Sequence, residues 1–378
     1  MGPLSGIKIV EFAGIGPGPF AAMLLADLGA EIIRIDRKQP SDLGLKRAPR
    51  FDYALRNRKA IRLDLKDAAG LSFAARLVDR ADALMEGFRP GVMERLGLGP
   101  DECLARNPRL VYGRITGWGQ NGPLAPAAGH DLNYIALTGA LHAIGRAGGP
   151  PAIPLSLLGD YAGGALYLVL GLLSALLEAR SSGRGQVVDA AIVDGVASLT
   201  TQLHGMLRAG LLTHERGTNA IDSGSHYYEV YECADGKWIS LAPVEPKFYH
   251  AMLDALEVRI ETPQQDRASW AEAKMRIAKR IRSKTRDEWT ALLEGTDVCF
   301  APVLDFDEAR QHPHLRARET YVDVAGERQP APAPRFSRTQ PALPQAGEVA
   351  ATPEAVEAAL RDWMSEDEVR TALREGAL

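Results

Sequence analysis

The chain has 378 residues, of which 46% are hydrophobic and 24% charged, with a formal net charge of −4. This length predicts two domains, and the composition excludes a disordered chain. The charge balance argues against bulk binding to nucleic acid or to an anionic membrane. Three cysteines are widely spaced and form neither a disulfide framework nor a metal cluster. We therefore expect a cytoplasmic protein without a metal site.

The first part of the chain has the order of a βαβ unit. Residues 6–12 read as a buried strand, 14–18 as a glycine-rich turn, 19–28 as a helix and 31–36 as a second strand. Further apolar strands are predicted at residues 60–64, 83–86, 110–112 and 187–191. Strands alternating with helices predict an α/β fold with a Rossmann-like parallel sheet.

The most apolar stretch, residues 161–177, is shorter than the roughly 20 residues that a membrane-spanning helix needs. It also contains Gly163, Gly164 and Gly171. We interpret it as a helix buried in the core of a protein that does not enter a membrane, and the N-terminus shows no signal-peptide pattern.

The character of the sequence changes in its second half. Helical spacing at residues 194–211 is followed by alternating runs at 228–233 and 237–242, which indicate a hairpin, and by helices at 246–256 and 270–293. We predict a large domain over 1–200 that is joined by a C-terminal return at 335–378, a linker helix region at 201–224, a small α+β domain at 225–327 and an extended linker at 328–344. The return ends in one amphipathic helix at 355–375.

Two titratable residues stand at the heads of predicted helices. His130 and Asp160 each follow a glycine and precede an apolar helical segment. A helix N-terminus combines free N–H groups with a partial positive charge, so it favours developing negative charge. Two such bases around one centre could remove a proton from one face of a carbon and return it to the other. The simpler interpretations are a core histidine and a helix-capping aspartate.

The glycine-rich turn leaves two ligand classes open. It follows a strand, opens a helix and has Asp36 about 20 residues further on, as in dinucleotide-binding sites. The G-x-G-x-x-G pattern counted from Gly14 fails, however, because Pro19 occupies its last position. Basic residues after the strands suit a phosphorylated ligand of some kind, although each alone could be a solvated surface residue.

Several longer motifs stand at residues 3–11, 86–91, 116–123, 183–186 and 231–236. Together they resemble the family III CoA-transferases. Within that superfamily, the stretch 129–134 looks like the α-methylacyl-CoA racemase branch, since the transferase branch keeps the aspartate that matches Asp160 but is not expected to have the histidine.

The resemblance implies a Rossmann-like domain that binds CoA, a smaller domain, and an interlocked homodimer. His130 and Asp160 match the two proton-transferring groups, Glu245 matches the acidic residue that supports the histidine, and the backbone at Asp131 could stabilise the enolate. The matched CoA contacts are Arg37, Leu63, Lys66, Phe88, Arg95, Gly16 and Tyr134. CoA would be part of a 2-methylacyl-CoA substrate, and no separate cofactor is expected.

Three other functions remain open. A CoA-transferase would use Asp160 as a nucleophile that forms an acyl anhydride. An NAD-dependent oxidoreductase is favoured only by the glycine turn and Asp36. A catalytically silent acyl-CoA-binding protein would bind CoA without exchanging the α-proton.

Overall fold

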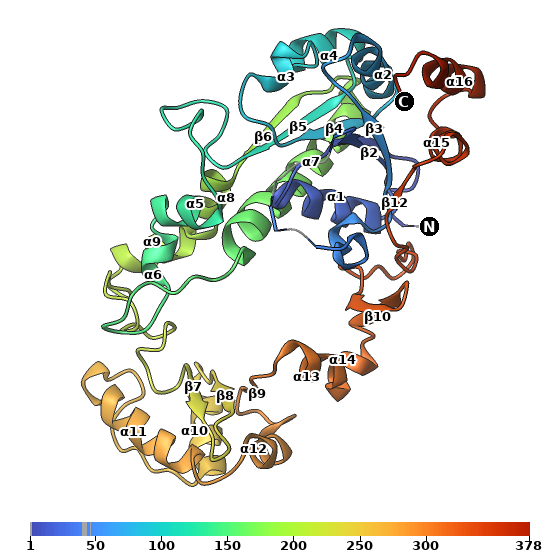
Figure 1. The fold of residues 1–378 in the computed structure, drawn as a ribbon. Coiled ribbons are helices and arrows are strands. Elements are labelled where there is room, and N and C mark those ends of the chain that lie inside the picture. The colour runs from blue at the N-terminus through green and yellow to red at the C-terminus, as the bar shows by residue number, and fades with distance from the viewer. Residues whose placement is uncertain (1, 40–43, 46) are drawn as a thin grey trace. The chain divides into compact units, whose positions relative to one another are not determined.

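The computed structural model describes residues 2–39, 44–45 and 47–378 (Figure 1). It divides the chain into two compact units. The first combines Met1–Thr138, Pro154–Leu199 and Glu319–Leu378, and the second combines Gly139–Ile153 and Thr200–Arg318. The chain therefore re-enters the first unit twice and the second unit once.

The first unit is built on a parallel sheet with the strand order β12-β3-β2-β1-β4-β5-β6. The strands are β1 (Lys8–Phe12), β2 (Glu31–Arg37), β3 (Lys59–Leu63), β4 (Ala83–Glu86), β5 (Val111–Thr116), β6 (Val187–Ala191) and β12 (Glu348–Val349). Neighbouring strands pair in parallel throughout the described part of this sheet. This confirms the predicted α/β fold with a large parallel sheet. The strand order reverses between β1 and β4, where sheets of this type bind ligands at the carboxyl ends of their strands.

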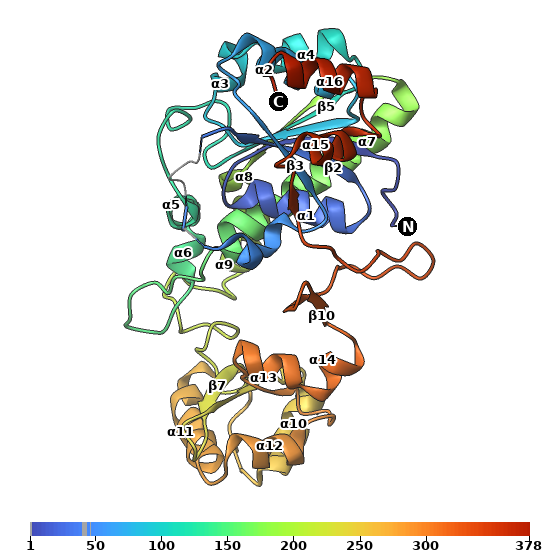
Figure 2. The same cartoon turned by 45° about the vertical axis from the view of Figure 1, so that its right-hand side comes forward.

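Helices cover both faces of this sheet, which explains why its strands read as continuous apolar runs. Helices α1 (Pro17–Asp27) and α7 (Leu166–Ser182) pack on the face that includes Ile9 and Ile32. The opposite face, which includes Ile33 and Ile61, is covered by α2 (Ala68–Val78), α4 (Pro100–Arg106), α15 (Pro353–Leu360) and α16 (Glu366–Arg374) (Figures 1 and 2).

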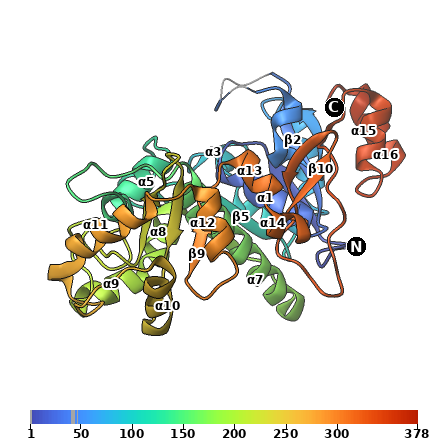
Figure 3. The same ribbon diagram turned by 90° about the horizontal axis from the view of Figure 1, so that it is seen from below.

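The C-terminal segment returns to this unit, but it ends in two helices rather than the single helix predicted at residues 355–375. After β12 pairs with β3, helices α15 and α16 lie side by side (Figures 2 and 3). Ser365 interrupts the helical run because its side chain caps α16, while Glu368 bonds back to the Ser365 N–H at 3.0 Å. Such a capping box begins a new helix.

The second unit has an antiparallel sheet of β7 (Glu229–Glu232), β8 (Trp238–Leu241) and β9 (Phe300–Pro302). The sheet packs against α10 (Pro246–Leu256), α11 (Trp270–Ile281) and α12 (Arg286–Leu293). The predicted helix at 270–293 is therefore two helices, because Thr285 and Glu288 form a capping box at the head of α12. Shorter helices in the unit are α6 (Ala140–Ala143), α9 (Thr201–Arg208), α13 (Phe306–Gln311) and α14 (Pro313–Ala317).

The observed units depart from the predicted ranges in three places. Residues 139–153 and 201–224 lie in the second unit, although we assigned them to the large domain and to a linker. The hairpin of β10 (Tyr321–Val324) and β11 (Glu327–Pro330) lies in the first unit, not in the small domain or the linker. The helix predicted at 194–211 divides into α8 (Ile192–Leu199) and α9, and the boundary between the units falls at Thr200. These boundaries follow spatial contacts, which chain order alone does not specify.

The apolar stretch at 161–177 is not buried on all sides, contrary to the prediction. It lies in a longer helical run of a π-helix, η3 (Leu157–Ala165), and α7. Leu168 and Leu172 are fully buried against the sheet, whereas Leu170 and Leu177 are 61% and 69% exposed. By length and composition the run Leu157–Ser182 could cross a membrane, and 44% of its most apolar window is buried. Its exposed leucines form an apolar face that the described residues of the first unit leave uncovered.

Candidate active site

Asp160 lies on η3, whose backbone touches two neighbouring segments of the first unit. A Cβ on Gly163 would lie 2.5 Å from Val196 of α8, and a Cβ on Gly164 would lie 3.2 Å from Pro17 of α1. The Tyr161 N–H donates to the Ser156 carbonyl at 3.2 Å, the five-residue spacing of a π-turn. Glycines thus let η3 settle against α8 and α1, and this packing fixes the position of Asp160.

The glycine-rich turn after β1 faces the Asp160 side chain. Gly16 has a φ of +69°, and a Cβ at this position would lie 2.9 Å from Asp160 Oδ2. Only glycine adopts this backbone conformation without strain and leaves room for the carboxylate. Two residues predicted from separate motifs, Gly16 and Asp160, are therefore neighbours at the carboxyl end of β1.

His130 and Asp131 form the head of α5 (Asp131–Leu137), which meets Asp160 directly. The Asp160 N–H donates to Asp131 Oδ2 at 2.6 Å. His130 is exposed, and its N–H donates to the Asn133 side chain at 3.0 Å. The Tyr134 hydroxyl donates to the carbonyl of Gly129, the residue before His130. The head of α5 is thus tied both to η3 and to its own preceding turn.

The environment of Asp160 shifts its titration toward neutral pH. Burial first, and the charge of the nearby Asp131 carboxylate second, raise its pKa from 3.8 to about 6, against the opposing effect of His130. Burial, and then the Asp160 charge, raises the pKa of the Tyr134 hydroxyl to about 12. A carboxyl group with a pKa of about 6 is populated in both protonation states near neutral pH, as an acid–base catalyst requires.

One expectation about the backbone has to be corrected. We expected N–H groups at both helix heads, near Asp131 and near Asp160, to be free to bind a developing oxyanion. The Asp160 N–H is already bonded to the Asp131 side chain. The Asp131 N–H, in the first turn of α5, belongs to the helix positions that have no intrahelical acceptor.

The predicted CoA contacts follow the carboxyl ends of neighbouring strands. Arg37 ends β2 and is exposed, and Lys66 is exposed three residues after the end of β3. Leu63 is 1% exposed, so only its backbone could reach a ligand. Because parallel strands end at one edge of the sheet, these residues share that edge with Gly16.

A buried ion network that the sequence analysis missed supports the loop after β4. The Phe88 N–H donates to Glu86 Oε2 at 2.7 Å, and Arg114 bonds Glu86 at 2.8 Å and Glu94 at 2.7 Å. Glu94 adjoins Arg95 at the end of α3 (Val92–Arg95). The network therefore fixes the loop that carries the predicted CoA contacts Phe88 and Arg95. The network is hard to predict from the sequence, because a charged residue within a strand gives no sign of whether its side chain is buried and paired.

Glu245 lies in the second unit, at the head of α10. Its side chain is exposed, and its carbonyl accepts from the N–H groups of Phe248 and Tyr249 at 3.1 and 3.0 Å. Its predicted support of the histidine continues to rest on the resemblance.

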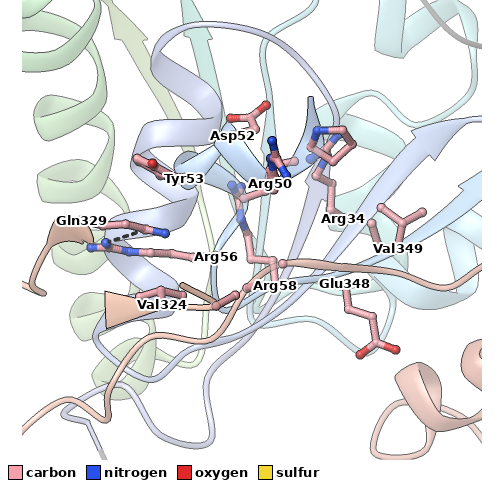
Figure 4. A pocket seen from close by; sticks show the side chains of 16 residues that line it. Arg34, Arg50, Asp52, Tyr53, Arg56, Arg58, Val324, Gln329, Glu348 and Val349 are labelled. Atoms are coloured by element: carbon pink, nitrogen blue, oxygen red, sulfur yellow. Dashed lines mark hydrogen bonds between the residues drawn. The ribbon is translucent and has the colours of Figure 1, made fainter. Parts of the chain in front are cut away.

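A separate cavity of the first unit, of about 150 Å³, is lined by four arginines and by none of the predicted site residues (Figure 4). We call it the arginine cavity, after Arg34, Arg50, Arg56 and Arg58. Arg56 bonds Asp27 and donates to the Pro330 carbonyl at 2.6 Å, which anchors the returning C-terminal segment. The cavity therefore belongs to the scaffold of the first unit.

Comparison with known proteins gives the class to which this fold and site belong. The family model for CoA-transferase family III matches residues 4–355, so the chain belongs to this family. The chain is 43% identical to the mouse α-methylacyl-CoA racemase over 91% of its own length and 88% of that protein. It is 41% identical to the human α-methylacyl-CoA racemase over 90% of its own length and 88% of that protein.

Among solved structures, a CaiB/BaiF family protein from Brucella suis superposes with a TM-score of 0.79 at 25% identity, covering 96% of this chain and 99% of that one. The overall fold is thus shared across the family, whereas the higher sequence identity points toward the racemases.

Proposed function

We propose that this chain is a racemase that interconverts (R)- and (S)-2-methylacyl-CoA thioesters. The supporting similarity is 41–43% identity to two α-methylacyl-CoA racemases over about nine-tenths of the chain. The single observation that carries the proposal is the link between Asp160 and the helix head that starts at His130, made by the Asp160 N–H and the Asp131 carboxylate at 2.6 Å. In this proposal the link holds the two titratable groups, His130 and Asp160, at one site.

The reaction is a 1,1-proton transfer through an enolate. One group removes the C2 proton, the C–H electron pair moves into the thioester, and negative charge collects on the thioester oxygen. The Asp131 N–H is the proposed donor to that oxygen, and one such donor contributes about 3 kcal/mol. The opposite group then gives a proton to the other face of C2.

His130 and Asp160 exchange these roles when the enantiomer changes, so each has to act both as acid and as base. The pKa of about 6 for Asp160 supports this requirement. Glu245, from the same chain or from a second copy, would hold the His130 ring in position.

CoA binds in this proposal as part of the substrate, along the carboxyl edge of the sheet. Arg37, Lys66 and Arg95 would supply charge to its phosphates. Phe88 and Tyr134 would contribute ring contacts, while Leu63 and Gly16 would contribute backbone. Remote contacts of this kind position C2 between the two proton-transferring groups.

We further propose that the chain works as a homodimer. The exposed apolar face of α7 supports this, since Leu166, Leu170 and Leu177 are 50%, 61% and 69% exposed. A row of exposed leucines on one helix is typical of a surface that a partner covers. Sedimentation at micromolar concentration should give twice the chain mass, and a monomer would contradict this part of the proposal.

Proton NMR in D2O tests the function. Each pure enantiomer of a 2-methylacyl-CoA should lose its C2 proton signal and converge on the same mixture of isomers. Retention of configuration and of the C2 proton across a panel of acyl chains would reject the racemase.

A CoA-transferase is the second candidate, favoured by the family to which the chain belongs and by the position of Asp160 beside the Gly16 turn. In that reaction an Asp160 oxygen attacks the thioester carbonyl, CoA leaves as the thiolate, and an acyl anhydride remains on the enzyme. Trapping of an acyl group at Asp160 with hydroxylamine, without α-proton exchange, would favour this function.

A further inference from the structure

The Asp131 side chain has no role in the proposed chemistry so far, yet it is bound more closely to Asp160 than any other acidic group that the structure describes. Asp131 is 6% exposed, and its Oδ2 accepts the Asp160 N–H at 2.6 Å. A Cβ on Gly159 would lie 2.4 Å from the same oxygen. The residue before Asp160 therefore has to be glycine for the Asp131 carboxylate to approach this closely.

Asp131 is also an electrostatically costly residue in its position. Its Oδ1 is buried and has no hydrogen-bond partner among the described residues. In the same described set, neither Asp131 nor Asp160 takes part in an ion pair. Burying a carboxylate so near another costs free energy unless the arrangement serves the site.

The groups around Asp160 come from few elements. Helix α5 brings His130, Asp131 and Tyr134, and η3 itself brings Tyr161, whose pKa is raised by burial and then by the Asp160 charge. The α1 segment beside η3 carries no charge before Asp27, which pairs with Arg56, and the Asp194 side chain of α8 is exposed. Among the residues that the structure describes, Asp131 and His130 are thus the two whose charges act on Asp160.

We infer, on the premise of the proposed function, that the Asp131 carboxylate is a positioning residue for Asp160. Its Oδ2 holds the backbone N–H at the head of the reactive segment, so that the Asp160 carboxylate stays between the Gly16 turn and the head of α5. Its negative charge also favours the protonated form of Asp160, which the group needs when it returns a proton to C2.

The charge effect has a definite sign. Burial is the larger cause that raises the pKa of Asp160 to about 6, and Asp131 is the second. The rate of α-proton exchange in which Asp160 acts as the base falls as the pH drops through that value, because the carboxylate becomes protonated. Removal of the Asp131 charge should move this acid limb of the pH profile to lower pH.

Two variants separate the contact from the charge. Asp131→Asn keeps an oxygen that can accept the Asp160 N–H but removes the charge, whereas Asp131→Ala removes both. We expect α-proton exchange at neutral pH to fall about tenfold in the first and about 100-fold in the second, within the range of acid–base contributions. The KM for acyl-CoA should stay unchanged in Asp131→Asn. Asp101→Asn, at an exposed site in the first turn of α4, is the matched control.

The Asp160 carboxyl carbon can be followed by 13C NMR without substrate, which separates this inference from the proposed function. A lower titration midpoint in Asp131→Asn than in the unmodified protein supports the inference, even if no acyl-CoA reacts. An unchanged midpoint together with an unchanged acid limb in Asp131→Asn would overturn it, even if the racemase activity is established. Circular dichroism of both variants confirms that any loss arises in a folded protein.

Discussion

The arginine cavity and the Asp131–Asp160 carboxylate pair lie in the same unit, but their charged groups have opposite surroundings. In the cavity, Arg56 pairs with Asp27 at 2.5 Å and Arg58 pairs with Glu11 at 2.5 Å, and all four side chains are at most 4% exposed. At the site, the Asp131 carboxylate accepts the Asp160 N–H and its charge acts on the Asp160 carboxylate, and neither carboxylate has an ion-pair partner within the described residues.

This difference distinguishes charges that stabilise the fold from charges that could take part in a reaction. A buried charge with a partner of opposite sign stabilises the fold, because its removal leaves the partner charge buried and unpaired, which costs free energy. Two like charges at one site shift the pKa of at least one of the two groups away from its ordinary value, and such a shift is useful at a site that transfers protons. Burial alone does not identify a functional residue: His226 is fully buried, bonded to Tyr249 at 2.7 Å, and has its pKa lowered to about 4 by burial.

The largest effect should follow from removal of either of the two groups that we propose to transfer protons. His130→Ala and Asp160→Asn should each reduce racemisation about 1,000-fold, because one face of C2 then lacks its acid or base. Chiral analysis of the acyl-CoA gives the rate, with Asp101→Asn as the control for charge removal. If either variant racemises the substrate at the rate of the unmodified protein, that residue does not transfer the proton, and the proposed difference between the carboxylate pair and the scaffold charges is wrong.

The opposite result is expected in the arginine cavity. Glu11→Gln should lower the free energy of unfolding by about 3–5 kcal/mol, because it leaves Arg58 buried without its counter-charge. Urea unfolding measures the change. The double variant Glu11→Leu/Arg58→Met should recover most of the loss, and both variants should keep normal turnover per folded molecule. A large loss of turnover would mean that the cavity takes part in the reaction.

A glycine pair tests the space around the Asp160 carboxylate. Gly16→Ala should lower α-proton exchange about tenfold, because its Cβ would lie 2.9 Å from Asp160 Oδ2 at a φ of +69°. Gly14→Ala is the matched control in the same turn, since its Cβ meets no atom of the described residues within 4 Å. The two variants are compared by their α-proton exchange rates, measured by NMR in D2O. Equal rates would show that Gly16 does not provide the space that Asp160 needs.

The smallest effect concerns stability. Since the folded protein raises the pKa of Asp160 from 3.8 to about 6, its ionised form destabilises the fold above that range. Asp160→Asn should therefore stabilise the protein at pH 7 by about 1 kcal/mol, after allowance for partial solvent exposure. The gain should disappear below about pH 4, where Asp160 is protonated in both the folded and the unfolded state. Thermal unfolding at pH 7 and pH 4 checks the sign, and destabilisation at pH 7 would contradict it.

The sequence predicted those features that local patterns determine. The strands at 83–86 and 187–191 have the predicted bounds. Residues 83–86 are buried on both faces of the sheet and leave an apolar run, whereas 187–191 lies at an edge of the described sheet and its first three residues are not buried. The breaks before α12 and α16 were missed, although the Thr285–Glu288 and Ser365–Glu368 pairs signal them. At both breaks the apolar residues keep their helical spacing, but the side-chain caps end one helix and begin the next.

The contact between Asp131 and Asp160 could not be predicted in the same way. The two residues are 29 positions apart on different helical segments, and the bond joins a backbone N–H to a side chain. Only the packing of η3 against α5 and α8, with glycine at positions 159 and 163, brings them together. The sequence indicated the residues that we propose to react, while the tertiary contacts determine the pKa of Asp160.

The most direct test of the two-group mechanism is early-time NMR of one pure 2-methylacyl-CoA enantiomer in D2O with the unmodified protein. Transfer through two different groups predicts that the product enantiomer carries deuterium at C2 from the first turnovers, while the remaining substrate keeps its proton. A product enantiomer that retains the substrate's own C2 proton would show that a single group serves both faces, and would contradict the assignment of His130 and Asp160 as opposed acid and base.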